Sequence, residues 1–251
     1  MTMQPQITLP GDAASYVVEQ NYGRYTQIEQ NTWQHLYNLR MEQLREHACR
    51  EYLEGIEVLN ITADRMPVIE RLNETLRKRT NWMLLPVSGF LPGRTFFDLL
   101  AARIFPSTTY IRKPESLDYT PAPDIFHDVF GHVPMHANRV FADYLQAFAQ
   151  IARQIDNDAD QERLGRLFWY TVEFGLIRQD GKVKLYGSGV ISSQKESTNV
   201  INGGCVVHDF DLEEVLNTTV KVDELQPKLF AIDSFQQIFE ATPQVKEIFG
   251  V

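Results

Sequence analysis

The chain has 251 residues and an ordinary globular composition, with 43% hydrophobic and 23% charged residues. This composition excludes a disordered or fibrous chain, and the length fits one domain with a substantial core. The net charge of −9, without a long run of Lys and Arg, predicts no nucleic-acid partner. The chain shows neither a signal peptide nor about 18 consecutive apolar residues, so we expect a cytoplasmic protein that does not bind membranes.

The first half of the chain is predicted to be an arm followed by helices. Residues 1–24 are polar and interrupted by prolines, and we interpret them as an extended arm that precedes a single domain over residues 25–251. Apolar residues at helical spacing predict one long helix over about residues 27–53, and a second helix after Pro67. A loop rich in Pro, Gly and large apolar residues then precedes a helix over about residues 94–104.

The second half of the chain is predicted to mix helices with a few strands. We expect a helix to begin near Asp124, whose carboxylate can accept backbone N–H groups, and another to cover residues 160–174. The pattern indicates a strand pair around residues 187–189, a further strand within residues 220–233 and a C-terminal helix from about Ser234. The predicted fold class is therefore mostly α with a small β element (α+β).

The stretch "PDIFHDVFGHVPMH", residues 123–136, contains three of the six histidines. His127 and His132 are five residues apart, so their rings would point about 140° apart on an ideal helix. They could share a ligand only if the helix were irregular, and Gly131 and Pro134 are residues that could interrupt it. We interpret His136 as a surface residue or a residue behind the site, and not as a ligand.

A third residue turns this histidine pair into a candidate metal site. Glu173 lies in the apolar run "FWYTVEFGLI", where an unpaired carboxylate would be costly. Two imidazoles and one carboxylate form the facial triad of non-haem Fe(II) oxygenases. Two alternatives stay open, because similar ligands serve zinc hydrolases and because hydrogen-bonded histidines are common in ordinary cores. Cys49 and Cys205 are predicted to be reduced and not to bind the metal.

Several motifs together resemble one enzyme family. The segments "YTPAPDIFHDVFGHVPM", "FWYTVEFGLI" and "YGSGVISSQKES" are similar to the catalytic domain of the pterin-dependent aromatic amino acid hydroxylases. The segment "LLPVSGFLPGRTFFDLLAARIFPSTTYIR" extends the resemblance, which covers roughly residues 82–239. The resemblance implies a single catalytic domain that uses Fe(II), a tetrahydropterin and O2, with the iron held by His127, His132 and Glu173. The chain is too short for the regulatory domain and tetramerisation helix of the animal enzymes, which predicts a monomer.

The resemblance also implies which residues contact the two organic molecules. The residues assigned to the pterin are Val87, Gly89, Phe90, Leu91, Phe96 and Asp128. The residues assigned to the amino acid are Arg112, Thr120, Pro123, Trp169, Ser192 and Val222. Within this set, the Arg112 guanidinium would bind the substrate carboxylate, and Ser192 would also fix the orientation of a ligating histidine.

The expected reaction is hydroxylation of L-phenylalanine to L-tyrosine. Val222 stands where the tyrosine hydroxylases carry an aspartate, and an apolar residue suits an unhydroxylated ring. Tryptophan hydroxylation is the alternative within the family. A zinc hydrolase is less favoured because it has no use for the apolar loop over residues 87–97, and the complete ligand set opposes a catalytically silent protein.

Overall fold

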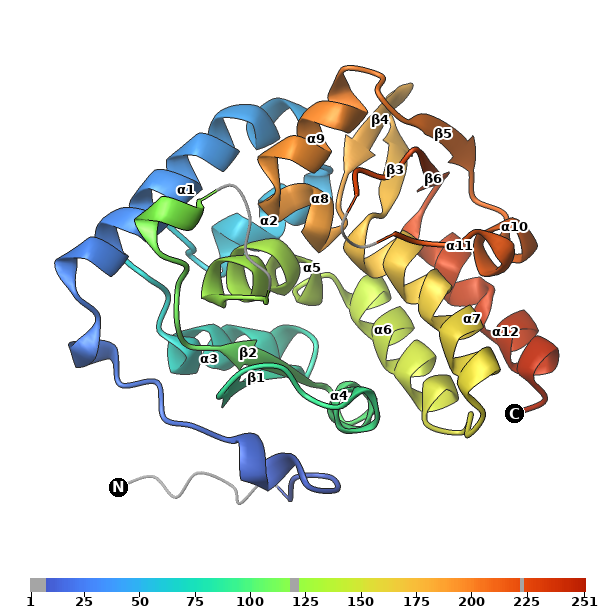
Figure 1. Cartoon of the computed structure of the whole chain (residues 1–251), viewed down its shortest axis with the longest axis horizontal. Helices are drawn as coiled ribbons and strands as arrows, with labels where there is room; N and C mark the ends of the chain where they lie inside the picture. The colour runs from blue at the N-terminus through green and yellow to red at the C-terminus, as the bar shows by residue number, and fades with distance from the viewer. Residues whose placement is uncertain (1–7, 118–121, 222–223) are drawn as a thin grey trace.

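Helices surround two small β-sheets in this protein (Figure 1). The computed structural model describes residues 8–117, 122–221 and 224–251. The fold is mostly α with a small β element, as predicted. The buried apolar side chains form one large cluster through most of the chain and a smaller one beneath the first sheet.

The long N-terminal helix predicted over residues 27–53 is in fact two helices, α1 (Gln27–His47) and α2 (Arg50–Val58). Ala48 and Cys49, between them, have extended backbones, and the Cys49 N–H donates to the Leu185 carbonyl at 2.9 Å. The Cys49 sulfur then accepts the Tyr52 N–H at the start of α2. Contact with a distant strand breaks the helix, so local periodicity could not predict the break. The helix after Pro67 is α3 (Ile69–Arg79).

The first sheet pairs β1 (Met83–Val87) with β2 (Ile104–Thr108) in parallel, and α4 (Gly93–Ala101) connects them. The helix predicted over residues 94–104 therefore ends early, and β2 follows at once after Arg103 in a left-handed conformation (φ 60°). The N-terminal segment runs along this sheet, because the Val18 N–H donates to the Pro86 carbonyl and Tyr16 accepts the Ser88 N–H. This segment includes two 3₁₀ turns, η1 (Ala13–Tyr16) and η2 (Tyr22–Arg24).

The second sheet has four strands in the order β4-β3-β6-β5. Its strands are β3 (Leu176–Gln179), β4 (Lys182–Leu185), β5 (Val206–Asp209) and β6 (Lys228–Ile232). The strand pair predicted around residues 187–189 was wrong in its position. The hairpin turns at Asp180 and Gly181, which both have positive φ, as a tight hairpin turn requires. Residues 187–189 instead lead into the short helix α8 (Ser188–Ser192).

The remaining helices lie between and beyond the sheets. They are η3 (Pro114–Ser116), α5 (Val133–His136), α6 (Arg139–Ala152), α7 (Asp158–Phe168), α9 (Gln194–Ile201), α10 (Leu212–Asn217), α11 (Phe235–Glu240) and α12 (Thr242–Phe249). Two segments are π-helices, η4 (Phe126–His132) and η5 (Trp169–Glu173). The helix predicted over residues 160–174 is therefore α7 followed by a π-helical turn, and α8 packs against both π-helices.

Candidate metal centre and surrounding site

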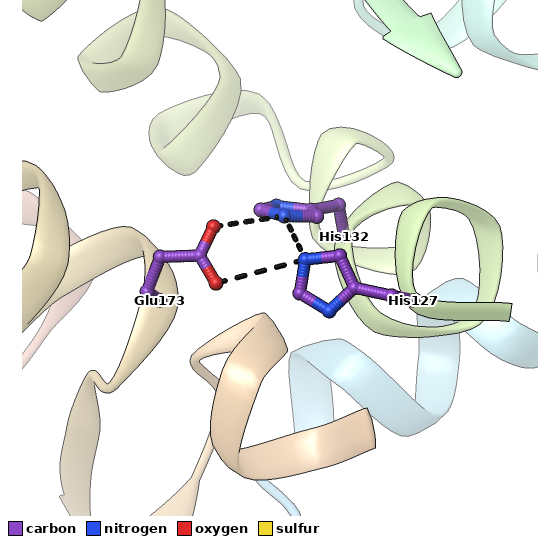
Figure 2. A group of neighbouring side chains, drawn as sticks. All are labelled: His127, His132 and Glu173. Atoms are coloured by element: carbon purple, nitrogen blue, oxygen red, sulfur yellow. Dashed lines mark hydrogen bonds and ion pairs between the residues drawn. The ribbon is translucent and has the colours of Figure 1, made fainter. Parts of the chain in front are cut away.

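The two π-helices bring His127, His132 and Glu173 together (Figure 2). The His132 Nε2 lies 3.2 Å from the His127 Nε2 and 3.0 Å from the Glu173 Oε1. The His127 Nε2 lies 3.8 Å from the Glu173 Oε2. The donor atoms of all three residues lie within 4.8 Å of one another, so one cation could contact them all.

The π-helical geometry of η4 explains how two histidines five residues apart converge. In a π-helix the hydrogen bonds join residue i to residue i+5, so His127 and His132 lie one turn apart. The predicted irregularity is confirmed, but it takes the form of a π-helix and not of an interruption of the helix. Pro134 lies inside a continuous helical segment, because α5 follows η4 directly, and the Phe130 carbonyl four residues before it accepts the Tyr52 hydroxyl at 2.9 Å. Gly131 permits close packing, because a Cβ there would lie 3.1 Å from the Ser188 carbonyl oxygen.

The protonation states of Glu173 and His127 suit metal binding. Burial by itself raises the Glu173 pKa, but the two neighbouring imidazoles and Ser188 outweigh it and lower that pKa to about 2. Burial lowers the pKa of His127 to about 4. The Glu173 carboxylate is therefore ionised and the His127 imidazole neutral at neutral pH, as metal ligation requires. Two nitrogen donors and one oxygen donor with a single negative charge fit ferrous iron.

Two serines of α8 contact the ligands of this cluster. The Ser192 hydroxyl lies 2.9 Å from the His127 Nδ1, which leaves the Nε2 of that ring to face the other ligands. The structure thus places Ser192 against a ligand, as its predicted role in orienting a histidine requires. Ser188 was not predicted, although its hydroxyl lies 2.8 Å from the Glu173 Oε2. The two serines are four residues apart, which puts both on one face of a helix. This spacing could have predicted that Ser188 contacts the site together with Ser192.

His136 is not a surface residue, and that part of its interpretation was wrong. Its side chain is fully buried, and its Nδ1 lies 3.0 Å from the His132 carbonyl oxygen, where it donates a hydrogen bond. The ring packs edge to face against Trp82 and Phe105, and burial lowers its pKa to about 3. His136 therefore belongs to the core behind the site, and it is not part of the ligand cluster.

Four of the residues assigned to the pterin lie at the end of β1 and in the loop that follows, and Phe96 lies in α4. Val87 and Leu91 are buried, and Gly89 has a φ of 159°. Phe90 is 82% exposed, which marks it as a side chain without a packing role in the protein alone. Phe96 is half-buried and packs edge to face against Phe97, Phe105 and Phe168.

Asp128, also assigned to the pterin, is buried within η4. Its Oδ2 accepts hydrogen bonds from the backbone N–H and the hydroxyl of Thr108, both at 2.7 Å. Burial nevertheless raises its pKa to about 7. Asp128 therefore joins the end of β2 to the helix that carries the two histidines.

Arg112, assigned to the substrate carboxylate, makes a bidentate ion pair with Asp124. Its Nε and Nη2 donate to the two Asp124 oxygens at 2.8 Å each, and its Nη1 donates to the Leu117 carbonyl at 3.3 Å. Asp124 also accepts the His127 N–H at 3.0 Å, as its predicted helix-capping role requires. Burial by itself raises the Asp124 pKa, but Arg112 outweighs it and lowers that pKa. The pairing of Arg112 with Asp124 was missed because it joins two separate loops.

Of the other residues assigned to the substrate, the structure describes Trp169 and Pro123. Trp169 begins η5 and stacks on Phe174, with ring centroids 5.7 Å apart. The Pro123 carbonyl accepts the Tyr110 hydroxyl at 2.7 Å. Thr120 and Val222 lie outside the described residues.

Comparison with known proteins gives one consistent result. The sequence model of the family described as biopterin-dependent aromatic amino acid hydroxylase matches residues 13–248. The phenylalanine-4-hydroxylase of Ralstonia nicotianae is 41% identical over 228 residues, which are 90% of this chain and 73% of that protein. A solved structure of Chromobacterium violaceum phenylalanine hydroxylase with bound oxidised Fe(III) is 40% identical, with a TM-score of 0.90 over 95% of this chain and 87% of that chain. Another, with iron(III) and the oxidised cofactor 7,8-dihydrobiopterin, has a TM-score of 0.89 at 40% identity over 95% of this chain and 88% of that chain.

Proposed function

Because the chain belongs to the biopterin-dependent aromatic amino acid hydroxylases, we propose that it hydroxylates L-phenylalanine to L-tyrosine with Fe(II), a tetrahydropterin and O2. The observation that carries this proposal is the buried cluster of His127, His132 and Glu173, which offers a divalent metal three ligands on one side. The relative from Ralstonia nicotianae, named as a phenylalanine-4-hydroxylase, supports phenylalanine as the substrate.

Each part of the site has a distinct task in this reaction. His127, His132 and Glu173 would hold the iron, which together with the reduced pterin supplies the activation of O2. Arg112 has guanidinium N–H groups beyond those that bind Asp124 and Leu117, and these would bind the substrate carboxylate. The loop after β1 and the first turn of α4, over residues 87–97, would receive the pterin beside Phe96. The buried Phe105 ring, 4.8 Å from the His132 ring between centroids, would exclude water from that side of the metal.

The decisive experiment measures tyrosine formation by the purified protein with Fe(II), tetrahydropterin, O2 and phenylalanine. We expect product from the parent protein and none above background from Glu173→Gln. The matched control is Glu196→Gln, which converts another buried carboxylate to an amide outside the cluster and should keep its activity. Tyrosine formation that persists in Glu173→Gln would contradict the iron assignment. Absence of product from every aromatic amino acid would contradict the proposed reaction, and product from tryptophan alone would favour the alternative substrate.

The expected partners of the protein are small molecules. Within the described part of the chain, no helix is both long and apolar enough to cross a membrane. The monomeric state, the cytoplasmic location and the absence of a nucleic-acid partner stay predictions. Light scattering of the purified protein tests the first of them, and a dimer or tetramer would contradict it.

A further inference from the structure

We propose that Ser188 is a positioning residue that holds the Glu173 carboxylate so that a single oxygen, Oε1, is presented to the metal. The Ser188 hydroxyl lies 2.8 Å from the Glu173 Oε2, and this oxygen is 3.8 Å from the His127 Nε2. The Oε1 lies closer to its own neighbour, 3.0 Å from the His132 Nε2. The serine and the metal would therefore each take one carboxylate oxygen. This inference rests on the proposed assignment of the three ligands.

The direction of the serine proton follows from its three neighbours. Besides the Glu173 Oε2, the hydroxyl lies 3.0 Å from the His132 Nε2 and 3.4 Å from the Val172 carbonyl oxygen. A serine hydroxyl donates one hydrogen bond, and the His132 Nε2 lone pair is no longer available once it binds a metal. The carboxylate is the nearest acceptor and the charged one, so it receives the proton.

Close packing of α8 keeps this hydroxyl in place. Ser188 is only 1% exposed, and the preceding Gly187 touches the Glu173 backbone so closely that a Cβ there would lie 2.5 Å from its carbonyl oxygen. The other end of α8 is held by buried Arg40 of α1, whose Nε donates to the Ile191 carbonyl at 2.8 Å. The same guanidinium donates to the Ser197 hydroxyl in α9. Neither end of α8 is therefore free to move away from the ligands.

Ser188 and Ser192 each hydrogen-bond to a different ligand. Ser192 contacts the His127 Nδ1, the nitrogen on the far side of the ring from the cluster. Ser188 contacts the carboxylate itself, beside the place where the metal would bind. Hydrogen bonds of this kind fix ligand orientation, and their loss typically weakens metal binding 10- to 100-fold.

The test is Ser188→Ala with Co(II) as the probe metal, because Co(II) reports its coordination through visible absorption. We expect the Kd for Co(II), measured by competition with a chelator, to rise about 10-fold or more. We also expect a changed absorption spectrum, since the released Oε2 can turn toward the metal. The control is Ser193→Ala, which removes a hydroxyl that caps α9 and should leave the Kd and the spectrum as in the parent.

The outcomes separate this inference from the ligand assignment. Glu173→Gln is measured in parallel, and a parent-like Kd for that variant would contradict the ligand assignment itself. If Glu173→Gln loses Co(II) while Ser188→Ala keeps both the parent Kd and the parent spectrum, only the role of Ser188 is overturned. Circular dichroism of the metal-free proteins checks their folding. If Ser188→Ala does not fold, Ser188→Gly removes the same hydroxyl and the same criteria apply to it.

Discussion

The metal side and the loop side of the site differ in how much of their geometry the protein fixes by itself. On the metal side, Glu173 and His132 are buried, and Ser188 and Ser192 hydrogen-bond to the ligands. On the loop side, Phe90 is 82% exposed and Phe96 is half-buried. The ligands are therefore preorganised for a metal, whereas the loop leaves apolar side chains exposed that a bound second molecule could cover. Substitutions on the two sides should therefore change different measured quantities.

The largest expected effect comes from removing a ligand on the metal side. His132→Ala should weaken Co(II) binding by more than the roughly 100-fold that loss of a supporting hydrogen bond can cause, because a ligand itself is lost. Tyrosine formation should fall to background. The control is His208→Ala, which removes a partly exposed histidine that pairs with Glu214 outside the cluster. Parent-like Co(II) binding by His132→Ala would show that His132 is not a metal ligand, and the metal side would then not be defined by these three residues.

A smaller effect is expected at Arg112, which contacts the metal side through its ion pair with Asp124. Arg112→Lys keeps the charge but loses the bidentate geometry, so the KM for phenylalanine should rise about 10-fold, the equivalent of roughly 1.4 kcal/mol. Co(II) affinity should stay near that of the parent, because the His127 N–H still donates to Asp124. The control is Arg178→Lys, an exposed arginine of β3 that pairs with Asp209. An unchanged KM would contradict the role of Arg112 in substrate binding. A loss of Co(II) binding would show that Arg112 also supports the metal ligands.

The pH dependence of stability should reveal the buried histidines behind the metal side. Burial lowers the His136 pKa to about 3, below the value of about 6.5 in an unfolded chain. Between these values the unfolded chain binds a proton that the folded protein does not, so the free energy of unfolding falls as the pH falls below about 6.5. Asp128 and Glu196 act in the opposite direction, because burial raises each pKa to about 7.

The measurement is therefore a difference between two metal-free proteins, the parent and His136→Gln. Between about pH 7 and pH 5 the parent should lose roughly 2 kcal/mol more free energy of unfolding than the variant, at about 1.4 kcal/mol for each pH unit below 6.5. Urea unfolding at both pH values provides these free energies. Equal losses in the two proteins would show that His136 does not contribute to the pH dependence.

The smallest effect on stability is expected at the tip of the loop. Phe90→Ala should change the free energy of unfolding by no more than about 0.5 kcal/mol, because the side chain is largely exposed. The KM for the tetrahydropterin should rise severalfold if the side chain covers the bound pterin, while Co(II) affinity stays unchanged. Ile28→Ala, at an exposed position of α1, is the control. A loss of stability well above 0.5 kcal/mol would show that the Phe90 side chain packs against the protein, which contradicts an open loop side.

The fold class and the identity of the candidate ligands could be predicted from the sequence. Helical periodicity and few strand signals predicted a mostly α fold, and the cost of an unpaired carboxylate in an apolar run singled out Glu173. The resemblance assigned the same three ligands. Patterns of this kind are readable because they depend on each residue and its near neighbours along the chain.

The way in which those residues come into contact depends on the three-dimensional structure. The π-helical turn of η4 aligns His127 with His132, and a rule based on 3.6 residues per turn places them on different faces. Ser188 reaches Glu173, and Arg112 reaches Asp124, only because separate segments pack together. The break between α1 and α2 likewise depends on a hydrogen bond from Cys49 to Leu185, far along the chain. Such contacts gain their free energy from burial and hydrogen bonds between distant segments, which no local pattern in the sequence records.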